Sequence, residues 1–219
     1  MVPARAAERT DASVRLERVS RSLLGRPYRS APLGGGPGVP EKLVAGRDAF
    51  DCVTYVEMVL AAAFTRGEGD FRRRLCRLRY AGGRVSWEAR NHYMVDWLRN
   101  ARRSGLVREV ALGPGSVTRR RLLDVVPGLV PRTRTIRAFP KRLVARAAPK
   151  LRTGDLICFA STRAHLDVFH CGLIVQDGGR LLLRHASKSR ERVVEQGLFE
   201  FLRANRMSGV IVARPVERR

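Results

Sequence analysis

The sequence has few cysteines, and they lie far apart. They stand at positions 52, 76, 158 and 171, form no close C-x-x-C pair, and do not complete a zinc-ligand spacing with the four histidines. Aromatic residues make up only 6% of the chain, and no nucleic-acid-binding motif accompanies them. The spacing of the cysteines and histidines argues against a disulfide framework and a structural metal. We therefore expect neither a metal nor a cofactor.

Long apolar runs are also missing. No run approaches the roughly 20 residues that a membrane-spanning helix needs. The first residues, MVPARAAERTDASVRLERV, are polar and charged where a secretory signal has an apolar segment. As written, the sequence predicts a cytoplasmic protein without a transmembrane segment. A start upstream of Met1, or export without a signal, would instead place the protein in the cell envelope.

Acidic residues are scarce relative to basic ones. The chain of 219 residues carries 43 Lys and Arg against 20 Asp and Glu, which gives a formal net charge of +23. Clustered arginines can bind nucleic acid or another anionic polymer by releasing counterions. The alternative is a solvated basic surface, which the scarcity of aromatic residues favours. A non-specific contact with anionic polymers is the partner that the charge alone indicates.

Hydrophobic spacing predicts helices first and strands later. With 44% hydrophobic residues the chain is long enough for one domain with a substantial core. We expect a disordered tail over 1–11, a single domain over 12–219, and a basic insertion around 113–150 whose secondary structure the pattern does not assign. This order of elements predicts an α+β fold with an antiparallel sheet. The expected helices cover 12–25, 52–67 and 85–105, with a helix or loop over 71–80, and the expected strands cover 107–112, 156–160, 168–186 (as a hairpin) and 209–216.

Cys52 opens an apolar helical run, FDCVTYVEMVLAAAF, directly after a long loop rich in glycine and proline. A thiol at the N-terminus of a helix has its anionic form stabilised by unpaired backbone N–H groups and by the helix dipole, which lowers its pKa. This is the environment of a cysteine nucleophile; the alternative is a buried packing thiol. Asp51 and Glu57 can be helix charges or polar anchors near such a site.

Two histidines lie on the predicted hairpin, VFHCGLIVQDGGRLLLRHA. If Asp177 and Gly178 form the turn, His170 pairs with His185; if Gly178 and Gly179 form it, His185 lies diagonal to His170. Both registers place the two imidazoles on one face and turn Cys171 to the other. The hairpin therefore predicts a pair of histidines close enough for one to orient the other.

Several motifs occur in a fixed order along the chain: PYRSAPLGGG, FDC at a helix start, GDLICF, HCGLIV and HAS. Together they resemble the NlpC-type cell-wall cysteine hydrolases, a papain-like superfamily. The stretches DCVTYVE, LRYAGG, RNHYMVDW and DVFHCG resemble one branch of it, the N-acetylmuramoyl-L-alanine amidase-like domain, over about residues 14–215. The resemblance implies a papain-like α+β fold, with N-terminal helices packed on an antiparallel sheet.

The resemblance also implies site residues. Cys52 would be the nucleophile, His170 the general base and acid, and His185 the orienting group. Tyr28 matches the aromatic residue that helps line the oxyanion and substrate site, although it could instead pack under the long loop. Four candidates to contact substrate lie on RNHYMVDW, with packing and surface pairing as the alternative: Arg90, His92, Tyr93 and Asp96.

The function that the resemblance implies is cysteine-dependent hydrolysis of the amide between N-acetylmuramic acid and L-alanine, in peptidoglycan or a muropeptide. Two alternatives use the same scaffold, a stem-peptide endopeptidase and a thiol acyltransferase, because a triad does not define the bond it attacks. A third is a non-enzymatic basic binding protein. The members of this branch that act on the envelope carry an export signal, which the present sequence does not show.

Overall fold

The structure, a computed structural model, describes residues 11–65 and 67–217. The predicted tail over 1–11 lies outside these residues, apart from Asp11, which caps the first helix. The α-helices are α1 (Ala12–Ser22), α2 (Cys52–Ala63), α3 (Glu68–Arg79), α4 (Met94–Arg103), α5 (Val144–Ala147) and α6 (Leu198–Ala204). Three 3₁₀ turns are η1 (Ala81–Gly83), η2 (Lys141–Leu143) and η3 (Ala148–Lys150). The strands are β1 (Val107–Glu109), β2 (Val117–Leu123), β3 (Arg132–Ala138), β4 (Leu156–Ala160), β5 (Val168–Asp177), β6 (Arg180–Ser187), β7 (Arg192–Gly197) and β8 (Gly209–Pro215).

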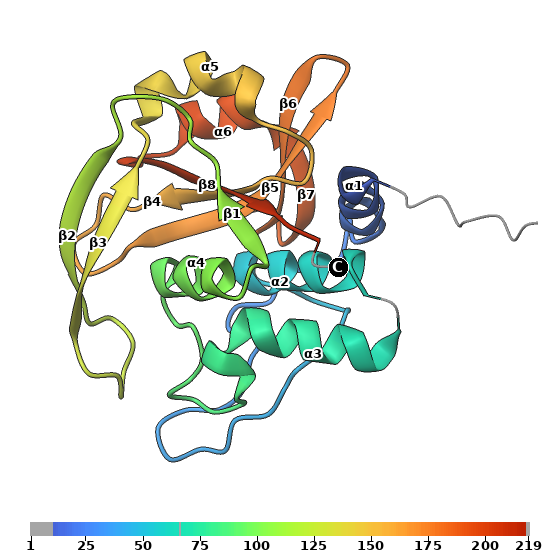
Figure 1. Cartoon of the computed structure of the whole chain (residues 1–219), viewed down its shortest axis with the longest axis vertical. Coiled ribbons are helices and arrows are strands. Elements are labelled where there is room, and N and C mark those ends of the chain that lie inside the picture. Colours follow the sequence, from blue (N-terminus) through green and yellow to red (C-terminus); the bar gives the residue numbers. More distant parts are fainter. Residues whose placement is uncertain (1–10, 66, 218–219) are drawn as a thin grey trace, which may run out of the picture.

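Six of the strands form one antiparallel sheet in the order β1-β8-β4-β5-β6-β7. Figure 1 shows α2, α3 and α4 on one side of this sheet and α5 and α6 on the other. Each side has its own apolar core, one built around α2 and one around α6. The predicted α+β class with an antiparallel sheet is confirmed.

Helix α2 is apolar on almost every side because it lies between the sheet, α1 and α3. Nine of its residues are buried, and it contacts β5 and β6 directly. Its start is fixed by a capping box: the Thr54 N–H donates to the Asp51 carboxylate over 2.7 Å, and the Asp51 N–H donates to the Thr54 hydroxyl over 3.0 Å. This cap determines that the helix begins at Cys52.

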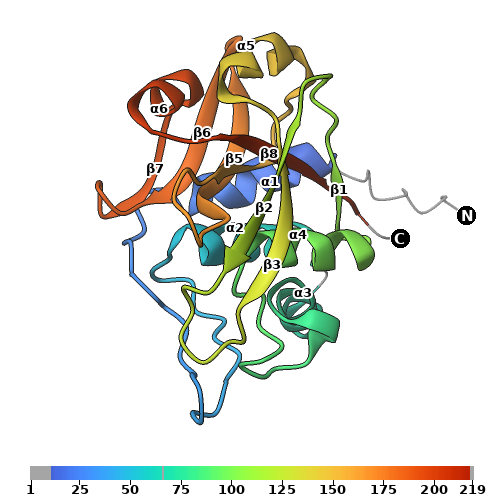
Figure 2. The ribbon, with the colours of Figure 1, turned by 90° about the vertical axis from the view of Figure 1, so that its left-hand side faces the viewer.

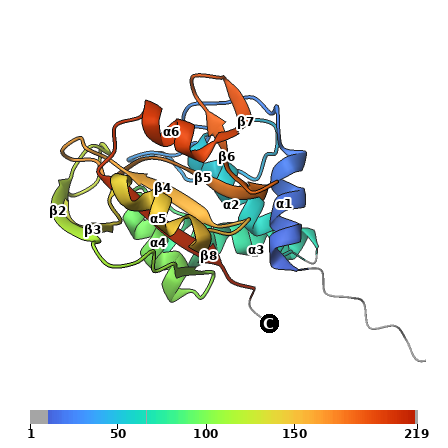
Figure 3. The ribbon, with the colours of Figure 1, turned by 90° about the horizontal axis from the view of Figure 1, so that it is seen from above.

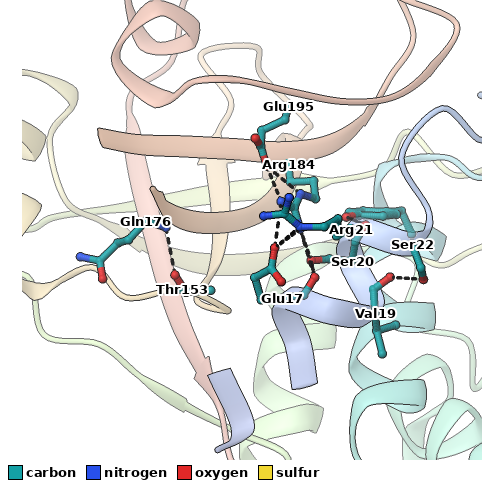
Figure 4. A network of polar contacts seen from close by, with 10 residues as sticks. Glu17, Val19, Ser20, Arg21, Ser22, Thr153, Gln176, Arg184 and Glu195 are labelled. Atoms are coloured by element: carbon teal, nitrogen blue, oxygen red, sulfur yellow. Dashed lines mark hydrogen bonds and ion pairs between the residues drawn. The ribbon is translucent and has the colours of Figure 1, made fainter. Parts of the chain in front are cut away.

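A buried arginine joins α1 to the sheet. Arg184 on β6 is only 1% exposed at its side chain and forms ion pairs with Glu17 of α1 and Glu195 of β7. It also donates to the Ser20 hydroxyl over 2.7 Å. Figure 4 shows the guanidinium between these partners, and Figure 3 shows α1 beside α2 at the side of the sheet.

The chain after α1 extends the sheet beyond β7 and leads to the start of α2. Gly25 and Tyr28 donate backbone hydrogen bonds to Val193 and Glu191 over 2.9 and 2.8 Å. Phe50 then pairs in parallel with Tyr28. Cys52 follows two residues later, so the edge of the sheet determines where the thiol lies.

The predicted hairpin at 168–186 is present, with Gly178 and Gly179 as its turn. Asp177 pairs with Arg180, and both glycines have positive φ, 51° and 78°. Such a two-residue turn needs left-handed backbone at both positions, which glycine adopts without strain. Of the two registers, the structure therefore has the one that sets His185 diagonal to His170.

The basic segment 113–150, which the sequence pattern left unassigned, contains a second hairpin. Strands β2 and β3 pair with each other as a separate two-stranded sheet. Figure 2 shows this hairpin in front of the main sheet, reaching from the level of α5 to that of α4. The Arg121 guanidinium donates to backbone carbonyls of Ser161, Arg163 and Leu166, which ties the hairpin to the loop before β5.

The predicted secondary structure differs from the observed structure in several places. The strand expected over 107–112 ends at Glu109. The helix expected over 85–105 is confined to α4, because Arg90 forms a bridge with Tyr80 and the Asn91 side chain donates to the Leu78 carbonyl, which keeps the preceding residues non-helical. The helix or loop over 71–80 is the helix α3, and β7 and α6 were not predicted. Among the described residues, no helix has the length and apolar character needed to cross a bilayer.

Candidate active site

The two predicted histidines of the hairpin meet directly. His170 Nε2 and His185 Nδ1 lie 2.7 Å apart, and the rings are nearly perpendicular at 85°. Gly172 lies opposite His185: a Cβ added there would come within 2.9 Å of the His185 Cβ and of the Arg184 carbonyl oxygen. The absence of a side chain at Gly172 thus allows His185 to lean toward His170.

Burial, and then the charge of His170, lower the pKa of His185 to about 3. His185 is therefore neutral near pH 7 and carries one ring proton. A hydrogen bond between two ring nitrogens needs one donor and one acceptor. If His170 donates from Nε2, the His185 proton lies on Nε2. That Nε2 is buried without a hydrogen-bond partner among the described residues.

Cys52 lies within reach of this pair. Hydrogen bonding with Cys171 lowers the pKa of the Cys52 thiol well below its ordinary value; burial opposes this effect, and the hydrogen bond and charge of His170 lower the pKa further. Because His170 uses Nε2 toward His185, Nδ1 is the nitrogen left for Cys52. The structure thus brings the three residues Cys52, His170 and His185 together in one chain of contacts.

Cys171 is the second thiol at this position. Its Sγ donates to the Cys52 carbonyl oxygen over 3.4 Å. Its pKa is raised well above the ordinary value, first by the hydrogen bond to Cys52 and then by burial. These opposite shifts favour a thiolate at Cys52 over a thiolate at Cys171.

Two further groups surround the thiol. Burial, and then the charge of Cys52, raise the pKa of Asp51 to about 6, while its hydrogen bonds with Thr54 oppose the rise. Burial raises the pKa of Tyr28; a hydrogen bond with Ser30 opposes this, and the charges of Cys52 and Asp51 add to it. Tyr28 is half-buried and packs against the α2 core. It therefore lies near Cys52, and its role at the oxyanion and substrate site stays a prediction.

A family model described as N-acetylmuramoyl-L-alanine amidase-like matches residues 18–210, most of the chain. The chain belongs to the N-acetylmuramoyl-L-alanine amidase-like family. This confirms the branch that the sequence motifs indicated, and the amidase-like family is associated with hydrolases that act on peptidoglycan. No curated protein matches the chain significantly in sequence.

Solved structures support this membership of the amidase-like family. An N-acetylmuramoyl-L-alanine amidase from Bacteroides uniformis is 27% identical, with a TM-score of 0.83 over 93% of this chain and 98% of its own. A Bacteroides fragilis protein provisionally named a xylanase is 26% identical, with a TM-score of 0.78 over 90% and 99%. A Legionella pneumophila protein, at 20% identity, shares the fold with a TM-score of 0.82 over 94% and 90%.

The four substrate-contact candidates of this amidase-like chain lie around the start of α4, and each has partners within the protein. Arg90 stacks over Trp87 at 4.4 Å, and His92 Nε2 bonds the Trp87 carbonyl at 2.7 Å. The buried Tyr93 accepts from the Val126 N–H, and Asp96 forms ion pairs with Arg134 and Arg132. These contacts fit the packing alternative, and no contact joins the four to Cys52 among the described residues. Their role in binding substrate stays a prediction.

Sequence reasoning missed one contact at the site and left others open. The strand pattern turned Cys171 away from the two imidazoles, yet its Sγ donates to the carbonyl oxygen of the candidate nucleophile Cys52. Asp51 caps α2, while Glu57 is a polar anchor at 2% exposure. No group of three or more His, Cys, Asp or Glu among the described residues is arranged to hold a metal ion.

Replacing Cys171 by alanine should raise the pKa of Cys52, because the hydrogen bond that most strongly favours its thiolate is lost. At pH values below the pKa of Cys52 in the variant, alkylation of Cys52 by iodoacetamide should slow roughly tenfold, as expected for the loss of one hydrogen bond to a charged group. Rates measured against pH, with the labelled peptide identified by mass spectrometry, test this. The matched control is Cys158→Ala, a neighbouring buried thiol on β4 that does not bond Cys52. Identical profiles for Cys171→Ala and the wild type would contradict the assignment.

Proposed function

We propose that this protein hydrolyses the amide between the lactyl carbonyl of N-acetylmuramic acid and L-alanine, using a Cys-His-His triad on a papain-like scaffold. The observation that carries the proposal is the chain of contacts from Cys52 through His170 to His185. Membership of the amidase-like family supports the choice of bond.

The contacts suggest roles for each residue. The Cys52 thiolate attacks the lactyl carbonyl carbon, and the developing oxyanion is held by the Cys52 N–H, which has no acceptor within the helix, and by the Tyr28 hydroxyl. His170 gives the proton taken from the thiol to the leaving amine of L-alanine. Water then attacks the thioester, with His170 taking its proton, and the muramic acid carboxylate leaves as the thiol is regenerated.

His185 serves this reaction by staying neutral. Its Nδ1 accepts the His170 Nε2–H, which fixes the tautomer whose Nδ1 faces the sulfur. A neutral orienting group stabilises the imidazolium less than a carboxylate does. Formation of the thiolate–imidazolium pair must therefore depend more on the lowered pKa of the thiol.

The bond cleaved is tested by mass spectrometry of a purified muropeptide digest. An amidase releases the unsubstituted disaccharide and an intact stem peptide that begins with L-alanine. An endopeptidase instead leaves one or more amino acids on the sugar. An acyltransferase transfers the acyl group to a second amine, so its product carries a new amide in place of a free carboxylate. Protein alkylated with iodoacetamide is the control. A product that keeps L-alanine on muramic acid would overturn the proposed bond.

The basic surface supports a weaker contact with anionic polymers, the third alternative. Arg119, Arg120 and Arg137 on the β2–β3 hairpin are exposed and form no ion pair among the described residues. Binding through them would fall steeply with salt and would survive loss of Cys52. We regard this surface as an aid to attraction toward anionic wall material rather than as the main function.

A further inference from the structure

The two imidazoles rest against an aromatic side chain from α6, a helix that the sequence did not reveal. The Phe201 ring stacks on His170 at 5.5 Å and 30°, and meets His185 edge-to-face at 5.5 Å and 69°. Phe201 is itself held by Phe159 of β4 at 4.5 Å, and Phe159 also stacks on His170 at 6.2 Å. One buried phenylalanine therefore contacts both members of the histidine pair.

The other neighbours of His185 leave its ring few alternatives. On β5, Gly172 offers no side chain, and on β7 the residue opposite His185 is the uncharged Val194. His170 is the charged group that acts on His185, and the α6 side chain that forms a ring contact with it is the apolar Phe201. No charged or polar side chain among these neighbours competes with His170 for the Nδ1 of His185.

We propose that Phe201 is a positioning residue, whose ring keeps water from His185 and holds His185 Nδ1 against His170 Nε2. The proposal rests on the proposed function for its catalytic consequence, although the geometry itself does not depend on that function. Within residues 11–65 and 67–217, no hydrogen-bond partner is found for the buried Nε2 of His185. Its pairing with water is therefore the competing arrangement that the ring excludes.

Loss of the ring should have two effects. Water reaching the Nε2 of His185 gives the ring freedom to rotate, so Nδ1 leaves His170 and the base is misaligned with Cys52. Reduced burial also lets the pKa of His185 rise from about 3 toward its ordinary value. A protonated His185 has no lone pair for His170, so activity should begin to fail at a higher pH than in the wild type.

The test compares Phe201→Leu with Phe199→Leu. Phe199 lies on the same helix and borders the same core but has no ring contact with either histidine among the described residues. Phe201→Leu should lower kcat roughly 10- to 100-fold, the size expected for a misplacement of about 1 Å, with KM nearly unchanged. The acidic limb of its kcat/KM profile should move to higher pH. Phe199→Leu and Phe201→Tyr, which keeps the ring, should stay near wild type in both respects.

Nitrogen NMR of the histidine rings provides a reading that needs no substrate. In the wild type, His185 should stay neutral with its proton on Nε2 as the pH is lowered to about 5, whereas in Phe201→Leu it should titrate. Phe201→Met replaces the leucine variant if that protein unfolds. If a folded variant showed unchanged His185 signals and an unchanged pH profile, Phe201 would have only a packing role in the core. That result would overturn the proposal. A wild type inactive on every muropeptide would refute the function, while the NMR comparison would still decide the positioning.

Discussion

Cys52→Ala is expected to abolish amide hydrolysis while leaving the protein folded. The sulfur forms the only covalent bond between protein and substrate in the proposed mechanism, so kcat should fall by roughly 10⁴- to 10⁶-fold, as it does when a nucleophile of a comparable triad is removed. The fold should persist because Cys52 is the first residue of α2 and is only half-buried, whereas the buried residues of that helix begin at Thr54.

The measurement for Cys52→Ala is release of stem peptide from a muropeptide, together with a thermal unfolding curve. The matched control is Cys76→Ala, because Cys76 is also a half-buried free thiol on a helix but has no histidine partner among the described residues. The control should keep full activity. A folded Cys52→Ala protein with wild-type turnover would refute the cysteine mechanism.

Glu57→Leu is expected to destabilise the protein by about 3–5 kcal/mol, the usual cost of leaving one charge of a buried ion pair without its partner. Glu57 accepts from Arg79 over 2.7 Å and from the Trp97 indole over 3.1 Å. The side chains of Glu57 and Arg79 are only 2% and 3% exposed. This cluster joins α2, α3 and α4, and it therefore helps to fix the helix that carries Cys52.

Chemical denaturation measures the free energy of unfolding for Glu57→Leu. The double variant Glu57→Leu, Arg79→Leu should recover much of the loss, because an apolar pair leaves no charge buried. The matched control is Glu109→Leu, which breaks the exposed ion pair with Arg102 and should change stability by less than about 1 kcal/mol. Equal losses for Glu57→Leu and Glu109→Leu would contradict the role given to the buried cluster.

Predictions from the sequence were most accurate where local chemistry determines structure. The apolar run LICFA predicted β4 with its observed bounds, and two adjacent glycines predicted the β5–β6 turn. The start of α2 also followed from local signals, an acidic residue before an apolar helical run. The histidine pair followed in turn, because strand alternation is set by the backbone and not by distant contacts.

The parts that escaped prediction depend on tertiary contacts. Helix α6 has seven residues, too few for a helical period to be visible, and in β7 only Val193 is buried. The β2–β3 hairpin is rich in exposed arginine, and its inward side is marked only by Leu123, Ile136 and Ala138. The contacts of Phe201 and Cys171 with the candidate triad follow from these long-range arrangements, so no pattern in the sequence indicated them.

The candidate triad joins one short-range contact to one long-range contact. The two imidazoles are 15 residues apart within a single hairpin. Cys52 meets β5 across 119 residues, where the Cys171 Sγ donates to the Cys52 carbonyl oxygen, and this contact depends on the docking of α2 on the sheet. A disturbance that displaces α2 from the sheet would separate Cys52 from the two histidines, while the β5–β6 hairpin stayed intact. Turnover in this protein should therefore be lost when α2 separates from the sheet, before the sheet itself unfolds.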